Sequence, residues 1–169
     1  DGKQLLISAS PASFAGIGSE VKPGQIPQGF DYRLYLYDIA TKRTTPMLMH
    51  FNPSVANYQW NKGDGMIYFT ADDRMGRGLF RLNPKTLKTT KFDIPVTYVQ
   101  DFTISTTGKS SPHAVFFGQT PQRARDMYEC VLNKEKPTSK YIGSINFDEL
   151  YKNVAIAPSI SWQFKATRG

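Results

Sequence analysis

Short apolar stretches alternate with turn-forming residues along the whole chain. The apolar stretch at residues 66–71 follows an Asp-Gly turn at residues 64–65, and the chain opens with the same pattern before an apolar stretch near residues 3–9. In each copy a second apolar stretch comes next and ends in a turn rich in Lys and Thr. Apolar segments of this length, bounded by Gly, Asn and Asp, predict β-strands joined by tight turns.

An internal repeat relates these segments to one another. Residues 34–44 align without a gap on residues 79–89, at an offset of 45 residues. A period in the forties that contains only short strands and turns is typical of β-propeller blades, which have about four strands each. We therefore predict an all-β fold, a partial β-propeller of about two and a half to three four-stranded antiparallel blades. Closed propellers have about 4–8 blades, so we expect the chain to be incomplete.

The repeat divides the chain into blade units at about residues 1–50, 51–95 and 96–146, followed by a segment at 147–169. Predicted strands lie at residues 3–9 and 32–39 in the first unit, at 55–60, 66–71, 78–83 and 89–92 in the second, and at 98–105, 114–118, 126–132 and 140–145 in the third. Residues 146–151 are predicted to form one or two helical turns, and residues 160–167 a final strand. The loop at residues 11–30 is long, and such loops are usually functional or mobile.

The composition agrees with a globular β protein. Apolar residues make up 40% of the chain and charged residues 21%, which is enough apolar material for a buried core. Frequent Phe and Tyr favour strands, while 13 Gly and 11 Pro favour turns. One cysteine, Cys130, cannot form an internal disulfide. No apolar run reaches the ~20 residues of a membrane span, and the compartment, cytoplasmic or periplasmic or secreted, stays open.

The formal net charge of +7 raises the question of a nucleic-acid partner. Because the 21 Lys and Arg are scattered among turns, a solvated surface explains them better, and we predict no nucleic-acid partner. A basic nucleic-acid-binding β protein is the weaker reading, and it predicts binding that falls steeply with added salt.

Three motifs resemble those of one enzyme family. Residues 60–69 (WNKGDGMIYF) resemble the W-S-P-D-G-K-x-I-x-F blade phrase of propellers attached to prolyl-oligopeptidase-type serine peptidases and of TolB-like propellers. Residues 69–74 (FTADDR) and 79–82 (LFRL) are similar to the F-T-A-E-D-R and L-Y-R-V hairpin of the acylaminoacyl-peptidase and dipeptidyl-peptidase branch. Residues 144–150 (SINFDEL), followed by residues 161–169 (SWQFKATRG), resemble the junction at which such propellers meet the α/β-hydrolase domain.

This resemblance implies a non-catalytic propeller fragment of a serine exopeptidase or oligopeptidase. In such enzymes the propeller gates the access of short peptides to an α/β-hydrolase domain with a Ser-Asp-His triad, which would follow Gly169. The triad serine lies in a G-x-S-x-G motif, and residues 16–20 (GIGSE) do not match it. The alternative is a TolB-like or WD-repeat-like propeller that acts as a protein-binding module.

The polar candidates within the chain have simple structural explanations. His50 and His113 lie in no motif that pairs them with a nucleophile or a metal, so neither is assigned as a general base. Asp72 and Asp73 could hold a hard cation or perform acid-base chemistry, but we expect a hairpin that caps its own backbone and pairs with Arg74. We therefore assign no catalytic, cofactor-binding or metal-binding residue.

Other features also favour structural roles. We expect the glycines of Gly76-Arg77-Gly78 to permit a tight hairpin, and Cys130 to be an inert small apolar residue. Packing between blades is expected for the aromatic residues Tyr32, Tyr35, Tyr37, Phe69, Phe80, Phe116, Phe117 and Tyr128. The glutamates, Glu20, Glu129, Glu135 and Glu149, are never adjacent, unlike the pair that grips a substrate amino terminus in the dipeptidyl-peptidase IV branch.

The expected partners follow from the same analysis. They are the α/β-hydrolase domain of the parent chain and, through it, short peptides, which the loop at residues 11–30 is the best local candidate to contact. Missing blades would leave unpaired strand edges and apolar faces, so we also expect self-association of the fragment.

Overall fold

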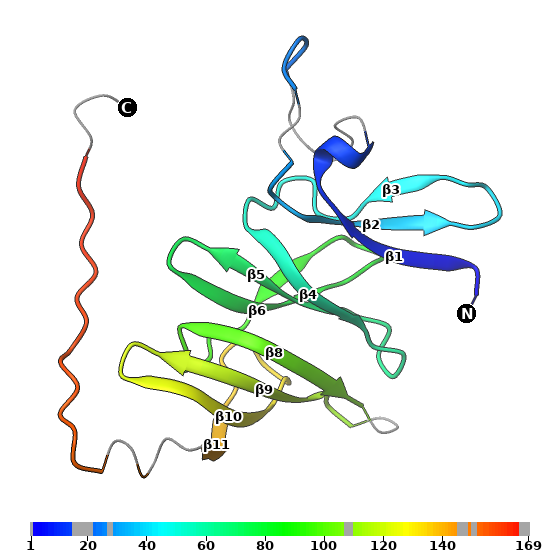
Figure 1. The fold of residues 1–169 in the computed structure, drawn as a ribbon. Coiled ribbons are helices and arrows are strands. Elements are labelled where there is room, and N and C mark those ends of the chain that lie inside the picture. Colours follow the sequence, from blue (N-terminus) through cyan, green and yellow to red (C-terminus); the bar gives the residue numbers. More distant parts are fainter. Residues whose placement is uncertain are drawn as a thin grey trace.

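The computed structural model describes residues 2–14, 22–26, 29–106, 110–144, 149 and 152–165. Within these ranges the chain forms eleven β-strands and one short 3₁₀ helix (Figure 1). The first sheet contains β1 (Gln4–Ala9), β2 (Arg33–Asp38) and β3 (Thr44–Pro46), with the helix η1 (Pro11–Phe14) after β1. The remaining strands are β4 (Ser54–Trp60), β5 (Ile67–Asp73), β6 (Gly76–Leu82), β7 (Thr89–Lys91), β8 (Tyr98–Ser105), β9 (His113–Thr120), β10 (Arg123–Val131) and β11 (Ser139–Ser144).

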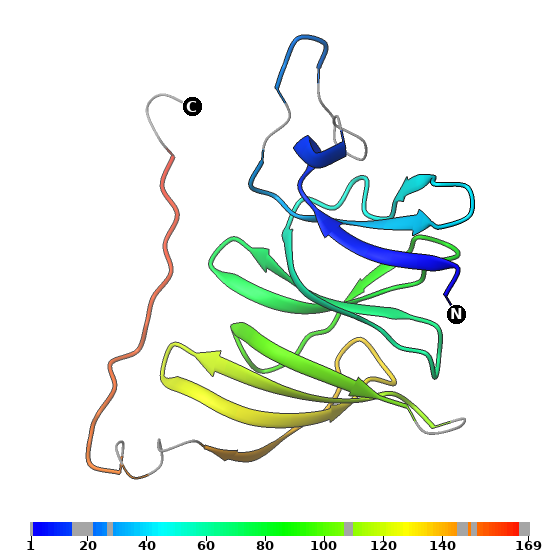
Figure 2. The same cartoon turned by 45° about the vertical axis from the view of Figure 1, so that its right-hand side comes forward.

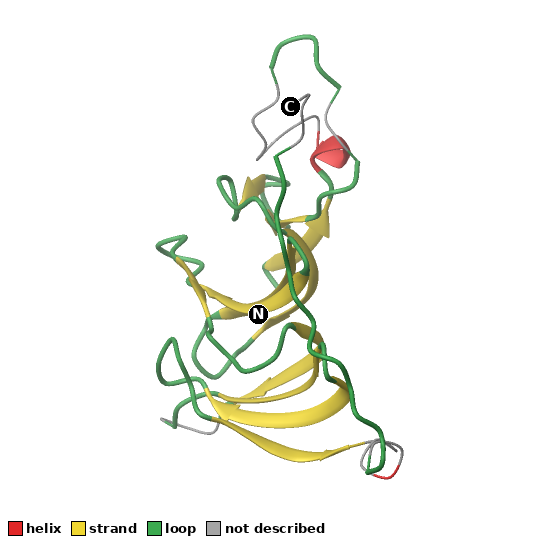
Figure 3. Ribbon diagram, turned by 90° about the vertical axis from the view of Figure 1, so that its left-hand side faces the viewer, coloured by secondary structure: helices red, strands yellow, loops and turns green. Residues whose placement is uncertain are grey.

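These eleven strands form three antiparallel units that we call blades 1, 2 and 3. Blade 1 is β1–β3, blade 2 is β4–β7 and blade 3 is β8–β11, and neighbouring strands within each blade pair antiparallel. Blades 2 and 3 are joined by a single parallel bridge, between Arg77 and Tyr98. Figures 1 and 2 show the three units stacked one above another. Figure 3 shows the stack from another side, with the sheets as separate layers that fan apart.

The hydrophobic core lies between the blades. Alternate side chains of β5 point to opposite faces, so Ile67, Phe69 and Ala71 belong to the cluster between blades 1 and 2, while Tyr68 belongs to the cluster between blades 2 and 3. All four side chains are fully buried. Full burial of one large apolar side chain contributes about 1.5–3 kcal/mol, so the two clusters hold the stack together. The central blade is thus apolar on both faces.

The internal repeat seen in the sequence is also a structural repeat. The first strand of blade 2 has a β-bulge between Val55 and Tyr58, and the first strand of blade 3 has one between Val99 and Phe102. In both strands the bulge follows the first buried valine of the strand. Gly65 has a φ of 72° in the Asp-Gly turn, and Gly2 has a φ of 74°, a backbone conformation that strongly favours glycine.

The predicted strands of the three blades are confirmed, with ends that differ by no more than three residues, whereas β3 was not predicted. The predicted final strand is wrong for its described part, because residues 160–165 are extended but pair with no strand. Residues 166–167 and most of the predicted helical turns at residues 146–151 lie outside the described residues. Within the described part of the chain, no helix has the length and apolar character needed to cross a membrane.

Candidate functional site

The surface formed by β4 and β8 is the candidate functional site. β4 is the first strand of blade 2, with β7 at the opposite edge, and β8 is the first strand of blade 3, with β11 at the opposite edge. We call β4 and β8 the inner strands. Along β4, Asn57, Gln59 and the following Asn61 alternate with Tyr58 and Trp60. Each of the three amide side chains donates a hydrogen bond to β8 or to the residue after it.

The Gln59 amide group makes the most complete of these contacts. Its Nε2 donates to the Ile104 carbonyl oxygen at 2.7 Å, and its Oε1 accepts from the Ile104 backbone N–H at 2.9 Å. A side chain therefore satisfies both backbone groups of a residue that is 4% exposed, as a neighbouring strand would. This pairing sets the position of blade 3 relative to blade 2 without a continuous β-ladder between them.

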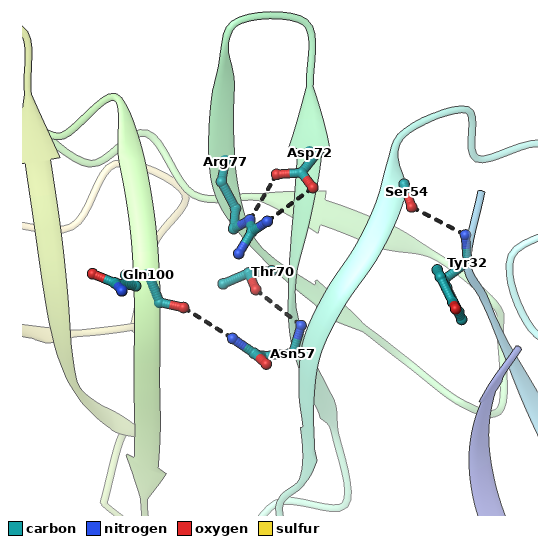
Figure 4. A network of polar contacts seen from close by, with 7 residues as sticks. All are labelled: Tyr32, Ser54, Asn57, Thr70, Asp72, Arg77 and Gln100. Carbon is teal, nitrogen blue, oxygen red and sulfur yellow. Dashed lines mark hydrogen bonds and ion pairs between the residues drawn. The ribbon is translucent and has the colours of Figure 1, made fainter. Parts of the chain in front are cut away.

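Asn57 and Asn61 extend the contact on either side of Gln59. Asn57 Nδ2 donates to the Gln100 carbonyl oxygen at 2.9 Å, and its backbone N–H, freed by the bulge, donates to the hydroxyl of the buried Thr70 at 3.2 Å (Figure 4). Asn61 Nδ2 donates to the hydroxyl of Thr106. We call Asn57, Gln59 and Asn61 the amide ladder. All three side chains are neutral, so the ladder orients the blades and offers no group that titrates near pH 7.

A second junction lies where β6 meets the start of β8. The Arg77 guanidinium binds both carboxylate oxygens of Asp72, at 2.6 and 2.9 Å (Figure 4). It also lies 4.6 Å from the centre of the Tyr98 ring. The hydrogen bond to Asp72 raises the pKa of Arg77, so its charge is permanent. The Arg77 backbone N–H donates to the Thr97 carbonyl oxygen. A Cβ atom on Gly76 would lie 2.5 Å from that same oxygen, so glycine permits this close approach.

A cavity of about 600 Å³ opens beside this junction. Its walls include Asp73, Arg77 and Lys91, together with the apolar side chains Met75, Phe92 and Val96. The Lys91 ammonium is 3.1 Å from Asp73, so charges of both signs line the opening. A mixed wall of this kind favours no single class of charged ligand.

The structure separates the two histidines and corrects the expected carboxylate pairing. His50 lies in the turn after β3, beside a hollow of about 410 Å³ formed with Met47, Phe51 and Leu87 among others, whereas His113 is the exposed first residue of β9. The sequence-based expectation that Asp72 and Asp73 pair with Arg74 is wrong. Asp72 pairs with Arg77 and Asp73 with Lys91, because β5 pairs antiparallel with β6, and β6 pairs antiparallel with β7, which brings these cations near the carboxylates.

The expected structural roles are confirmed for several residues. Cys130 is 3% exposed, and burial raises the pKa of its thiol to about 11, which suppresses its reactivity. Four of the aromatic residues belong to the clusters between blades: Phe69, Phe80, Phe116 and Tyr128. Tyr32 is an exception, because it is half-exposed and its backbone N–H donates to Ser54 Oγ at 3.0 Å (Figure 4).

Several candidates gain no chemical role from the structure. Glu129 pairs with Lys140 at 3.4 Å, Glu135 and Glu149 are exposed, and Glu20 lies outside the described residues. The loop at residues 11–30 is described only at residues 11–14, 22–26 and 29–30, so its proposed contact with substrate stays a prediction. In the described part of the chain, no three His, Cys, Asp or Glu side chains gather as a metal site would require.

Sequence reasoning missed the amide ladder. The sequence contains a pattern that could have indicated it: Asn57, Gln59 and Asn61 occupy alternate positions along β4 and just after it. Polar residues at alternate strand positions are usually taken as solvent-facing. Only the adjacent blade shows that Asn57 and Gln59 bind backbone groups and that Asn61 binds the Thr106 hydroxyl.

The comparisons with known proteins support the fold. The sequence matches no protein-family model, and no curated protein matches it. Among solved structures, the chain is similar to the β-propeller domain of the Trilobed protease from Pyrococcus furiosus, described as having an open velcro topology. The TM-score is 0.56 at 15% sequence identity, and the similarity covers 86% of this chain but only 38% of that one. The chain therefore has an all-β fold that matches part of a β-propeller domain.

Proposed function

We propose that this chain is a non-catalytic part of the propeller of a serine peptidase of the acylaminoacyl- or dipeptidyl-peptidase type. In this proposal it gates the access of short peptides to an α/β-hydrolase domain, and the segment at residues 147–169 leads toward that domain. The observation that carries the proposal is the structural similarity to a protease propeller. The three motifs at residues 60–69, 69–82 and 144–169 add independent support, because they occur in the family's order.

The physical basis of gating is a passage that does not widen. The amide ladder joins blades 2 and 3 through side chains that bind backbone groups at 2.7–2.9 Å. The apolar cluster between the same blades adds a second constraint. A passage held in this way can exclude a folded protein by size, and it requires no catalytic residue from the blades.

The first test asks whether the parent protein contains an activated catalytic serine. The coding sequence that contains this chain is expressed in full and treated with a fluorophosphonate, which labels activated serines. The proposal expects one labelled serine outside residues 1–169 and hydrolysis of short fluorogenic peptides. A parent protein without a labelled serine would contradict it and would favour the protein-binding module.

Gating is tested by loosening the ladder in that parent protein. Gln59→Leu should leave the hydrolysis of a short fluorogenic peptide unchanged and increase the hydrolysis of a folded protein substrate, which the passage otherwise excludes by size. Gln122→Leu is the matched control, because Gln122 is exposed in the turn between β9 and β10. Equal effects of the two substitutions on the folded substrate would remove the gating role while leaving the peptidase assignment intact.

A further inference from the structure

Arg33, the first residue of β2, holds a buried positive charge with unpaired donors. The residue is 9% exposed, and its Nε and Nη1 atoms are buried. None of the described residues supplies a hydrogen-bond acceptor for either nitrogen. Arginine stays protonated in proteins, and a buried polar group without a partner is rare because its bonds to water are lost and nothing replaces them. The unpaired guanidinium therefore indicates that an acceptor belongs at this place.

Other arginines of this chain are paired with carboxylates. Three of them bind an aspartate: Arg77 with Asp72, Arg123 with Asp126, and Arg125 with Asp101. All three arginines are less buried than Arg33. The attraction between opposite charges is stronger away from water, and a buried charge without a partner is costly. A carboxylate is thus the usual partner of arginine in this fold, and Arg33 has the greatest need of one among these four.

The neighbours of Arg33 on its face of the sheet carry no charge. Leu34 packs toward blade 2, so the Arg33 side chain lies on the opposite face of β2, where its partner across the pair with β1 is Ala9. Tyr35 follows on the same face and is fully buried, and Ile7 lies opposite Tyr35. Burial raises the pKa of Tyr35, and the Arg33 charge lowers it in part, which places the guanidinium near the phenol. A single positive charge therefore lies among apolar groups and one tyrosine.

Asp31 is the nearest carboxylate in the sequence, two residues before Arg33, and it does not fill this role. Neither Nε nor Nη1 of Arg33 donates to it. Asp31 precedes β2, so strand alternation does not fix its side chain beside the guanidinium. The acceptor that Arg33 requires is therefore not provided by the adjoining sequence.

We propose that Arg33 is a binding site for one carboxylate group, which pairs with the guanidinium on blade 1. A carboxylate is planar and matches the guanidinium fork with two parallel hydrogen bonds. It also carries one negative charge, which balances the single positive charge, whereas a phosphate dianion would leave an excess charge buried among apolar groups. The group comes either from a side chain of the parent protein outside the described residues or from a free carboxylate, and the test separates these sources. This inference rests on the unpaired guanidinium and not on the proposed peptidase role.

The test measures hydrogen exchange in the intact parent protein, read by mass spectrometry in the peptides that contain β1 and β2. Exchange there reports how often blade 1 opens. Arg33→Met removes the charge and keeps an unbranched stem, and Arg43→Met is the matched control because Arg43 is exposed in the connection between β2 and β3. Arg33→Lys, which keeps the charge without the planar fork, is measured in the same way in case the Met variant does not fold.

A carboxylate from the protein itself should make the effect of Arg33→Met depend on pH. At pH 7 the variant leaves that carboxylate buried and unpaired, so exchange should be at least about ten-fold faster than in the native protein. At pH 4 the buried carboxyl group of the variant gains a proton, and the ratio of the two exchange rates should fall toward one. Arg43→Met should exchange at the native rate at both pH values.

A free carboxylate is tested with sodium acetate as the probe, against sodium chloride at the same ionic strength and against neutral acetamide. At ten or more times its dissociation constant, acetate should slow exchange in β1 and β2 of the native protein at least about ten-fold. It should not slow exchange in Arg33→Met, and acetamide should slow it in neither protein. The proposal is overturned if the ratio of variant to native rates is near one, or is equal at both pH values, and no response specific to acetate appears.

Discussion

Gln59 and Ile104, 45 positions apart in the chain, are joined by two hydrogen bonds between one side-chain amide and one backbone unit. This relationship gives the contact between blades 2 and 3 a polar component with fixed geometry. The inner strands of the two blades do not pair with each other, so the side chain performs the function that a β-ladder performs within a blade.

Gln59→Leu should lower the free energy of unfolding by about 1–3 kcal/mol, because the Ile104 N–H and carbonyl are buried and lose their partner. Gln59→Glu keeps the acceptor but places a carboxylate oxygen against the Ile104 carbonyl. Its deficit should shrink as the pH falls through about 4, where the glutamic acid gains a proton and donates again. Urea unfolding of the three proteins at pH 7 and pH 4 measures both effects, and a Glu variant whose deficit is the same at both pH values would contradict this account.

Gly76→Ala should destabilise the protein by about 1–3 kcal/mol, since its Cβ would lie 2.5 Å from the Thr97 carbonyl oxygen and backbone would have to move. Gly143→Ala is the matched control in another strand, because a Cβ there meets nothing within 4 Å and the change should stay within about 0.5 kcal/mol. Thermal and urea unfolding compare the two. Equal losses would show that close approach at Gly76 is not the reason for its glycine.

Tyr68→Phe should cost about 1 kcal/mol, because the fully buried Tyr68 hydroxyl donates to Asp64 Oδ2 at 2.7 Å. Burial, and secondly the Asp64 carboxylate, raise the pKa of Tyr68 above its usual value. A raised pKa in the fold means that this contribution is complete below the usual tyrosine pKa of about 10 and is lost as the pH rises beyond it. Unfolding measured from pH 8 to 11 should therefore show a smaller alkaline loss of stability in the Phe variant than in the native chain.

The Cys130 thiol should react slowly with alkylating reagents while the protein is folded. Burial raises its pKa to about 11 from a usual 9.0, so the thiolate population falls by about 100-fold at pH 8, and access is blocked as well. Iodoacetamide labelling followed by mass measurement should be slow in buffer and fast in urea. Equally fast labelling under both conditions would show that Cys130 is accessible.

The hydrophobic pattern was sufficient to predict ten of the eleven strands in the described part of the chain, but it missed β3 (Thr44–Pro46). Alternation and Asp-Gly turns depend on neighbouring residues alone, so the strand at residues 98–105 was predicted with its observed ends, Tyr98–Ser105. The pairing of Asp72 was predicted incorrectly, because Arg74 is nearer in sequence but lies in the turn with a φ of 57°, whereas Arg77 lies directly opposite Asp72 across the hairpin.

The sequence by itself determined the fold class, the blade repeat and the lack of an internal disulfide, because strand periodicity, turn chemistry and the presence of one cysteine are properties of the chain alone. Only the tertiary structure decided which polar side chains hold the blades together. Asn57, Gln59 and Asn61 bind groups 43 to 45 positions away, and such contacts depend on the packing angle between blades, which no local pattern encodes. Ile160, Trp162 and Phe164 are exposed and lie in none of the described strands, although their alternation predicts a strand.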